Sequence, residues 1–159
     1  MNKTYLLLGS NMGNSRYQLA IAQKNIKKSI GKIIRQSNLY QTAAWGKTDQ
    51  PDFINQVVVV ETKLTAAETM NTILSIEKNM GRIRTSKNAP RIIDIDILFF
   101  NKDIIKTKML TVPHPFIQER RFVLVPLNEL SSRFIHPVVG KTVSQLLKDC
   151  PDKLDVKKI

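Results

Sequence analysis

The run of residues 90–100, Pro-Arg-Ile-Ile-Asp-Ile-Asp-Ile-Leu-Phe-Phe, constrains the fold of this chain more than any other segment. β-branched and aromatic residues dominate it, which predicts a β-strand bounded by the proline. Alternate residues of a strand share one face, so Asp94 and Asp96 point the same way with Cα atoms roughly 6–7 Å apart, and Leu98 and Phe100 follow on that face. Two like charges on a half-apolar surface are costly unless a cation neutralises them, and Mg²⁺ favours one or two carboxylates plus substrate phosphates. The alternative is a polar sheet edge that carries two acids.

Size and composition indicate one globular domain that spans residues 1–159. The chain has 159 residues, of which 42% are hydrophobic, enough for a sizeable core. Its apolar stretches are far shorter than the roughly 18–20 residues of a membrane span, and the strand-like residues 5–8 are too few for a signal peptide. Cys150 is the single cysteine and can form no internal disulfide, which favours the reducing cytoplasm.

The net charge of +12 predicts an anionic partner, such as a nucleic acid, a membrane surface or a nucleotide. Most lysines are scattered, but the segment 81–91 holds Arg82, Arg84, Lys87 and Arg91 without a single acid. This segment leads directly into the two aspartates. A cationic loop beside a metal-binding strand is what a polyphosphate requires.

Hydrophobic periodicity and turn residues predict the other elements. We expect strands at 5–8, 33–40, 53–62, 104–106 and 122–125, and helices at 16–30, 65–80, 116–121 and 142–147. A capping box opens the helix at Thr65, Thr142 caps the last helix, and residues 101–103 form a hairpin turn. Because strands do not alternate strictly with helices, the order predicts an α+β protein, a ferredoxin-like α-β-α sandwich with a mostly antiparallel sheet.

Several familiar motifs are absent from the sequence. The tripeptides 46–48 and 140–142 both read Gly-Lys-Thr, as at the end of a phosphate-binding P-loop. That motif needs a glycine five residues before its second glycine, and Gln41 and Ile135 stand there instead. One cysteine and two histidines give no zinc pattern, and we find no Ser/His/Asp grouping.

Three weaker features remain open to two interpretations. His114 stands between two prolines, which either aim its imidazole or make a plain turn. Residues 9–13 are not a G-x-G-x-x-G fingerprint but a strand-to-helix turn rich in small polar residues, and such turns are more often structural than functional. Trp45, Phe53 and Phe122 could form a flat pocket for a planar ring or belong to the core.

Taken in chain order, these segments resemble one known family. They are Gly9-Ser10-Asn11, Gln50-Pro51-Asp52-Phe53-Ile54-Asn55-Gln56, Glu77 before Gly81-Arg82-Ile83-Arg84, Pro90-Arg91 before Asp94-Ile95-Asp96, Val112-Pro113-His114, and Arg120 before Phe122-Val123-Leu124. The chain resembles the 6-hydroxymethyl-7,8-dihydropterin pyrophosphokinases of folate biosynthesis from about residue 4 to residue 145. It departs from many of them at Asn88 and Ala89, where an aromatic residue and a glycine are usual.

The resemblance implies a reaction and a metal requirement. Members transfer the β,γ-diphosphoryl group of ATP to the hydroxymethyl oxygen of the pterin and release AMP, on a ferredoxin-like sandwich. By that analogy Asp94 and Asp96 hold two Mg²⁺ ions, and Arg82 and Arg91 grip the phosphates as catalytic residues. Asp96 is the best candidate to take the hydroxyl proton, although metal coordination could suffice.

The resemblance also implies two sets of binding residues. The ATP-binding set is Glu77, Arg82, Arg84, Arg91, Ile97, Lys108, Thr111, His114 and Arg120. The pterin-binding set is Phe53 and Phe122 as two stacking rings, with Asn55, Thr42, Ala43 and Trp45 along the polar edge. The implied partners are ATP and the hydroxymethyl dihydropterin, without nucleic acid or membrane, on a monomer or a weak homodimer.

Two rival functions fit part of the same pattern. A two-metal nuclease or another phosphotransferase acting on nucleic acid would suit the charge, and its binding would fall steeply with salt. A non-catalytic RNA-binding module on the same sandwich would expose aromatic residues on its central strands. Asp94 and Asp96 would then repel phosphate unless a cation were bound between them.

Overall fold

The computed structural model describes residues 1–44, 49–83 and 89–159. In chain order the elements are β1 (Asn2–Ser10), α1 (Ser15–Ser29), β2 (Gly31–Gln36), β3 (Tyr40–Thr42), β4 (Phe53–Thr62), α2 (Ala66–Asn79), β5 (Asp94–Phe100), β6 (Ile105–Lys106), β7 (Thr111–Val112), a 3₁₀ turn (Ile117–Glu119), α3 (Arg121–Ser131), α4 (Val143–Asp149) and β8 (Val156–Lys158).

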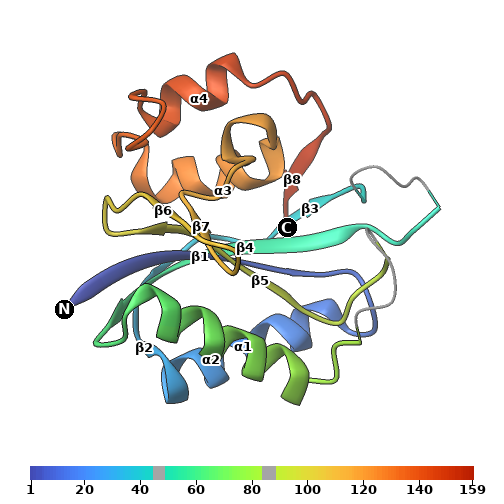
Figure 1. Ribbon diagram of the computed structural model, residues 1–159. Coiled ribbons are helices and arrows are strands. Elements are labelled where there is room, and N and C mark those ends of the chain that lie inside the picture. The colour runs from blue at the N-terminus through green and yellow to red at the C-terminus, as the bar shows by residue number, and fades with distance from the viewer. Residues whose placement is uncertain (45–48, 84–88) are drawn as a thin grey trace.

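An antiparallel sheet lies at the centre of the molecule (Figure 1). Its strand order is β5-β1-β4-β3-β8, and β2 also pairs with β4. β2 and β3 follow one another along the same edge of β4, because β2 pairs with its C-terminal half and β3 with its N-terminal end. The predicted antiparallel, ferredoxin-like α+β sandwich is confirmed.

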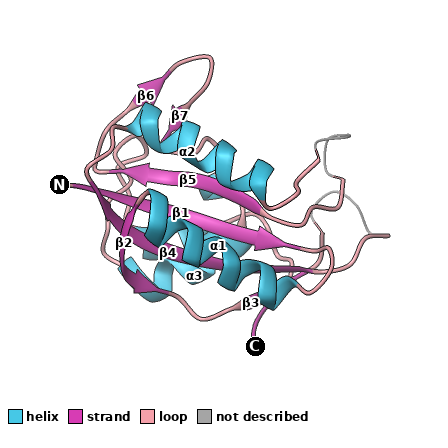
Figure 2. Ribbon diagram, turned by 90° about the horizontal axis from the view of Figure 1, so that it is seen from below, coloured by secondary structure: helices cyan, strands magenta, loops and turns pink. Residues whose placement is uncertain are grey.

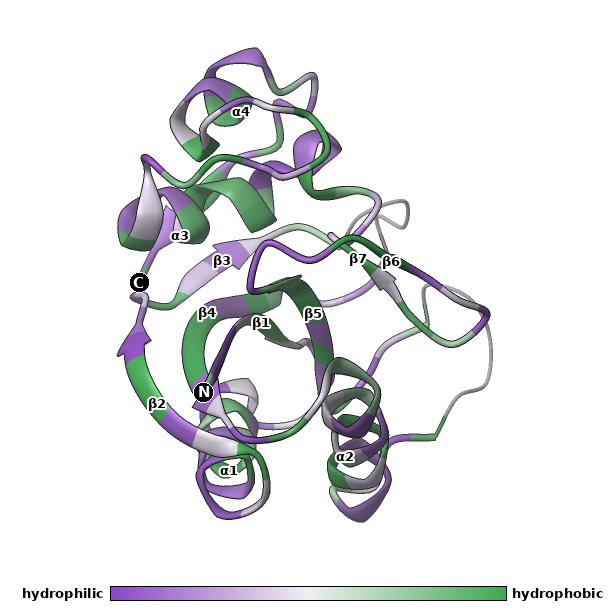
Figure 3. Ribbon diagram, turned by 60° about the vertical axis from the view of Figure 1, so that its left-hand side comes forward, coloured by the Kyte–Doolittle hydropathy of each residue, from purple (hydrophilic) through white to green (hydrophobic). Residues whose placement is uncertain are grey.

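Helices cover both faces of this sheet, with α1 and α2 on one side and α3 and α4 on the other (Figures 2 and 3). The alternation of β1 serves both layers, since Leu6 and Leu8 pack into the core with α1 and α2 whereas Leu7 packs against α3 and α4. Burying one such leucine contributes about 2 kcal/mol. The central strands are apolar on both faces for this reason.

A β-bulge in β5 changes which face its last residues meet. The pairing with β1 shifts between Tyr5 and Leu6, opposite Ile97 and Phe99. Leu98 and Phe99 therefore both face the α3 layer, and Phe100 faces the α1 and α2 layer. The expectation that Leu98 shares a face with Asp94 and Asp96 is confirmed, but the same expectation for Phe100 is wrong, because an extra residue reverses the alternation.

β5 also starts later than the sequence suggests. The run from Pro90 was expected to be strand throughout, yet the strand begins at Asp94. The backbone of Arg91 is instead paired with Asn11, whose side-chain Oδ1 accepts from the Arg91 N–H at 2.9 Å and whose N–H donates to the Arg91 carbonyl at 3.2 Å. This pairing takes Arg91 out of the ladder with β1.

The helix starts follow the predicted capping chemistry. Thr65 and Glu68 form a reciprocal capping box at α2, and Thr142 and Gln145 form another at α4. Gly81, with φ of 91°, follows the end of α2. Within the described residues, none of these helices has both the length and the apolarity to cross a membrane.

Three further expectations need correction. Residues 33–40 form two strands, β2 and β3, rather than one. Between them, side-chain bonds interrupt the ladder with β4, because the Ser37 hydroxyl accepts from the Val57 N–H and the Ser37 carbonyl accepts from the Gln56 side chain. Residues 122–125 were expected to be a strand but lie in α3, where tertiary packing of an apolar helix face overrides their strand propensity. The turn at 101–103 exists, but β6 pairs with β7 rather than with β5.

The close approach of β2 and β4 at Gly31 gives a test of this fold. A Cβ at Gly31 would lie 2.0 Å from the backbone carbonyl oxygen of Glu61, an atom that cannot move aside. We expect Gly31→Ala to lower the free energy of unfolding by more than ~2 kcal/mol, measured by urea denaturation.

The control is Gly140→Ala, where nothing lies within 4 Å but φ is 76°. Its backbone strain should cost only about 1 kcal/mol. Equal stabilities of the two variants would contradict the close approach.

Candidate active site

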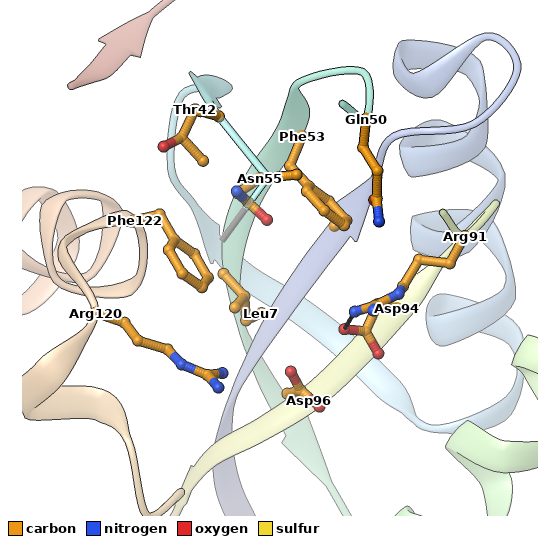
Figure 4. A pocket seen from close by; sticks show the side chains of 13 residues that line it. Leu7, Thr42, Gln50, Phe53, Asn55, Arg91, Asp94, Asp96, Arg120 and Phe122 are labelled. Carbon is orange, nitrogen blue, oxygen red and sulfur yellow. Dashed lines mark hydrogen bonds and ion pairs between the residues drawn. The ribbon is translucent and has the colours of Figure 1, made fainter. Parts of the chain in front are cut away.

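A pocket opens where the ends of β1, β3, β4 and β5 meet the start of α3 (Figure 4). It brings together residues that are far apart in the sequence, and sequence reasoning had assigned most of them to a site. They are Leu7, Gly9, Thr42, Ala43, Ala44, Gln50, Phe53, Asn55, Arg91, Asp94, Asp96, Arg120 and Phe122.

One half of the pocket is suited to a flat molecule. Phe53 comes from the start of β4 and Phe122 from the first turn of α3, and they approach the pocket from different sides (Figure 4). Asn55 is buried between them, 3% exposed, and its amide can both donate and accept hydrogen bonds. Gly9 lies beside it, where a Cβ would come 2.7 Å from the Asn55 Oδ1 atom. Only a glycine leaves that amide in place.

The other half is charged, and Asp94 is its centre. Asp94 Oδ1 accepts from Arg82 Nη1 at 2.7 Å, and Oδ2 accepts from Arg91 Nη1 at 3.1 Å. The side chains are largely withdrawn from water, with 23% of Asp94, 10% of Arg82 and 21% of Arg91 exposed. Charge-assisted bonds in such surroundings are stronger than those on an open surface.

Glu77 supports this cluster from behind. It lies on α2 with its side chain 4% exposed, and Oε2 accepts from Arg82 Nη1 and from the Ile95 N–H, both at 2.8 Å. The second bond fixes α2 to the backbone of β5 between the two aspartates. Glu77 therefore orients Arg82 and β5. Its role on the nucleotide side, implied by the family resemblance, stays a prediction.

Asp96 carries charge that its neighbours only partly compensate. Burial, together with the negative charges of Asp94 and Glu77, raises the pKa of Asp96 to about 8, while Arg120 and Arg82 oppose that rise. An ionised Asp96 is thus unfavourable in the free protein. A bound cation would relieve the penalty.

Guanidinium groups also lie against the aromatic half. The Arg91 Cζ atom is 5.4 Å from the centre of the Phe53 ring. On the other side, Arg120 lies 4.9 Å from the ring centre of Phe116 and 5.8 Å from that of Phe122. The two halves of the pocket are therefore contiguous, with Arg91 and Arg120 at their boundary.

His114 is held in a defined, neutral form near this boundary. Its ring Nδ1 accepts from the Phe116 N–H at 3.2 Å, and its backbone N–H donates to the Leu98 carbonyl at 3.0 Å. Burial and the nearby charge of Arg120 lower the pKa of His114 to about 4. With Nδ1 accepting, the neutral ring carries its proton on Nε2, which is a hydrogen-bond donor.

The remaining predicted residues lie away from this pocket. Ile97 packs into the core beside α1 and α2. Lys108 lies in the turn between β6 and β7, over a hollow that α2 also lines, and Thr111 is exposed on β7. Trp45 and Arg84 lie outside the described residues.

Sequence reasoning gave no role to Asn11. This residue is buried, holds the backbone of Arg91, and donates from Nδ2 to the Gln50 side chain at 3.0 Å and to the Pro51 carbonyl at 3.1 Å. It fixes the loop that carries Gln50 and the residue that reaches Asp94. Its position in a polar strand-to-helix turn was a signal, but one that turns share in general.

The donor set fits Mg²⁺ better than a metal that needs a full cage of side chains. Among the described residues no group of three or more His, Cys, Asp or Glu side chains converges on one point. Two carboxylates on one strand face, one of them with a raised pKa, match the pattern in which substrate phosphates complete the coordination. The residues present therefore fit a magnesium-bound polyphosphate.

Together the fold and the pocket define a phosphotransferase, with acids and arginines for a metal-bound polyphosphate beside two rings and an amide for a planar acceptor. Comparison with known proteins gives the same class in more detail. Residues 5–132 match the family model of the 7,8-dihydro-6-hydroxymethylpterin-pyrophosphokinases (HPPK). The chain belongs to this family.

Curated relatives agree along most of the chain. A 2-amino-4-hydroxy-6-hydroxymethyldihydropteridine pyrophosphokinase of Methylorubrum extorquens is 38% identical over 148 residues, which is 92% of each chain. One of Aquifex aeolicus is 37% identical, over 91% of this chain and 90% of the relative.

Some relatives are much longer. The chain spans 20% of a folic acid synthesis protein of Schizosaccharomyces pombe, to which it is 36% identical. A solved structure of Plasmodium falciparum HPPK-DHPS with pterin and p-hydroxybenzoate superposes with a TM-score of 0.75 at 21% identity, over 92% of this chain and 41% of that one. This likeness supports the fold.

The raised pKa of Asp96 predicts an unusual pH dependence of stability. The folded protein holds this proton more tightly than the unfolded chain, so between about pH 4 and pH 8 the folded state loses stability as pH rises. Asp96→Asn removes this term. In EDTA, we expect the variant to gain on the order of 4 kcal/mol over the wild type between pH 5 and pH 8.5, by urea denaturation.

Asp103→Asn, an exposed aspartate, is the control and should follow the wild type. A stability difference between Asp96→Asn and the wild type that does not change with pH would contradict the unfavourable ionisation of Asp96.

Proposed function

We propose that the chain transfers the β,γ-diphosphoryl group of ATP to the hydroxymethyl oxygen of 6-hydroxymethyl-7,8-dihydropterin and releases AMP, a step of folate biosynthesis. One observation carries the proposal: a paired-carboxylate, arginine-rich half and a two-ring half with a buried amide share a single pocket. The names of the curated relatives support the same reaction.

In this proposal Asp94 and Asp96 hold the magnesium, as two ions. When bound, the metal would neutralise and polarise the triphosphate. Diphosphoryl transfer needs charge neutralisation and positioning more than a covalent intermediate. A pair of acids flanked by arginines supplies both.

In this scheme Arg82 and Arg91 pair first with Asp94 and then with the phosphates of ATP. In the free protein they neutralise Asp94, which they contact at 2.7 and 3.1 Å. With a cation bound to Asp94, their guanidiniums would be available to hold the anionic phosphates. Arg82, held by Glu77, is the more fixed of the two.

The acceptor oxygen of the pterin would lie near Asp96. A ring between Phe53 and Phe122, with its polar edge on Asn55, Thr42 and Ala43, points its substituent toward β5. A carboxylate next to the acceptor oxygen can take its proton as transfer proceeds. Asp96 is the proposed proton acceptor.

His114 and Arg120 complete the nucleotide half. Because the His114 ring stays neutral, its Nε2–H can donate to a phosphate or ribose oxygen without adding charge. Arg120 adds a permanent positive charge on the side opposite Arg91. Lys108, Thr111 and Ile97 remain proposed nucleotide contacts through the family resemblance alone.

The RNA-binding alternative is less well supported. It requires aromatic residues exposed on central strands, whereas helices cover both faces of this sheet. We propose small-molecule substrates, a single domain over residues 1–159 that works as a monomer or a weak homodimer in the cytoplasm, and no role for nucleic acid.

The deciding experiment measures AMP release from ATP and Mg²⁺ with and without the hydroxymethyl dihydropterin. AMP that forms only when the pterin is present supports the proposal. ADP as the product, or nucleotide turnover independent of the pterin, would overturn it.

We expect Asp94→Ala and Asp96→Ala each to reduce turnover by orders of magnitude while the fold survives, because each removes a metal-binding carboxylate. Steady-state AMP release and circular dichroism test this. The matched control is Asp149→Ala, which should be unaffected, because Asp149 is an exposed residue of α4 that pairs with Lys141. Near-normal rates in either active-site variant would refute the metal role.

We further expect Arg91→Ala to slow the chemical step more than it weakens pterin binding, because Arg91 acts on the phosphates. Single-turnover kinetics separates the two effects. The exposed Arg133, just after α3, provides the control Arg133→Ala. A large loss of pterin affinity with a normal chemical step would contradict a phosphate-gripping role.

A further inference from the structure

The C-terminal segment, residues 150–159, joins the two elements that form opposite sides of the planar half of the pocket. The matched family pattern ends at residue 132, and the resemblance noted from the sequence ends near residue 145. Figure 1 shows this segment passing from the α4 layer to the edge of the sheet, where β8 pairs with β3. Its contacts belong to no recognised motif.

The first tie is to the start of α3. The Asp152 carboxylate accepts from the Arg121 N–H at 3.1 Å through Oδ2 and from the Leu154 N–H at 2.9 Å through Oδ1. Among the described residues the N-cap of α3, Arg120, makes no side-chain capping bond. Asp152 therefore caps this eleven-residue helix from a distant point in the chain, and its negative charge suits the helix N-terminus.

The residues next to this cap are the ones that meet the pocket. Arg121, whose N–H is bound, stands between Arg120 and Phe122, and both of these line the pocket. Because Phe122 lies in the first turn of α3, the position of that turn sets the position of its ring. Asp152 itself is not among the residues that line the pocket.

The second tie is to β3. Val156 pairs with Thr42 in an antiparallel ladder, and the Thr42 hydroxyl donates to the Asp155 carbonyl at 3.2 Å. The Ile159 N–H donates to the Leu39 carbonyl at 3.0 Å, which extends the attachment beyond the strand. Thr42 lines the pocket opposite the start of α3.

The far end of α3 is attached to the same strand by a different route. Glu129 accepts from the Tyr40 hydroxyl at 2.6 Å and from the Asn38 N–H at 3.1 Å. Its distance along α3 from Phe122 is nearly two turns. The Glu129 contact holds the back of the helix, and the segment from Asp152 to β8 holds the front, next to the pocket.

We infer that Asp152 is a positioning residue for the pterin half of the site, and that the segment from Asp152 to β8 sets the spacing between Phe122 and Thr42. The inference rests on the proposed function, since it concerns the ring that Phe122 would stack on. Asp152 acts only through α3. Its loss should disturb the fit of the planar substrate most, because Phe122 lies in the first turn of α3. Nucleotide binding should change less, because Arg120 is the member of that half that depends on α3, whereas Asp94 and Asp96 are built on β5.

The test compares substrate affinities of Asp152→Ala, Asp152→Asn and the control Asp149→Ala. Asp149 is an exposed aspartate three residues upstream that forms an ion pair with Lys141, away from β3 and α3. Dissociation constants are measured by pterin fluorescence and by nucleotide titration with a non-hydrolysable ATP analogue and Mg²⁺, with thermal melting as a check of folding.

We expect Asp152→Ala to weaken pterin binding at least fivefold with nucleotide binding changed less than twofold. Asp152→Asn keeps one accepting oxygen and should recover part of the affinity, and Asp149→Ala should match the wild type. Deleting residues 155–159, which removes the β3 tie and leaves Asp152, should show the same selective loss of pterin affinity.

Wild-type turnover in the same preparation separates two kinds of failure. A wild type without pterin-dependent AMP release would overturn the proposed function itself. An active wild type with unchanged pterin affinity in both Asp152→Ala and the deletion, or with equal loss of both affinities, would overturn only the positioning role.

Discussion

The balance of buried charge around Asp94 is the interaction on which the site depends. Three acids, Glu77, Asp94 and Asp96, lie within a small, largely dry volume, and arginines only partly compensate them. The same imbalance would favour the binding of a cation in the proposed metal site. A stability defect in the free protein is thus the source of the proposed metal site.

The sheet determines where this cluster can form. β5 lies between two helical layers, so its alternate residues must be apolar wherever both layers cover it. Near the start of β5 the pocket opens beside the start of α3, so two positions on one face are not covered by a helix. The two aspartates occupy these positions. The aromatic rings on β4 and α3 meet the same opening, which makes the two halves of the pocket neighbours.

Much of this could be read from local pattern. The strand at Phe53–Thr62, the capping boxes at Thr65 and Thr142, and the shared face of the two aspartates depend on neighbours in the sequence, so periodicity and residue type suffice. The expectations that failed depend on distant partners. Phe100 was placed on the wrong face because a bulge opposite Tyr5 leaves no mark in the sequence of β5, and residues 122–125 became helix because of their packing.

The sequence by itself determined which groups can bind: two carboxylates in phase, a basic segment before them, and rings and an amide of the family pattern. Only the tertiary structure decided how those groups act on one another. Arg91 contacts Asp94, three positions away, and Phe53, 38 positions away. Asn11 binds the backbone of Arg91 across 80 positions, and Asp152 binds the first turn of α3 across 31. Periodicity reports the face on which a residue lies. Contacts between distant residues form only when folding brings those residues together, so they depend on the tertiary structure and not on local pattern.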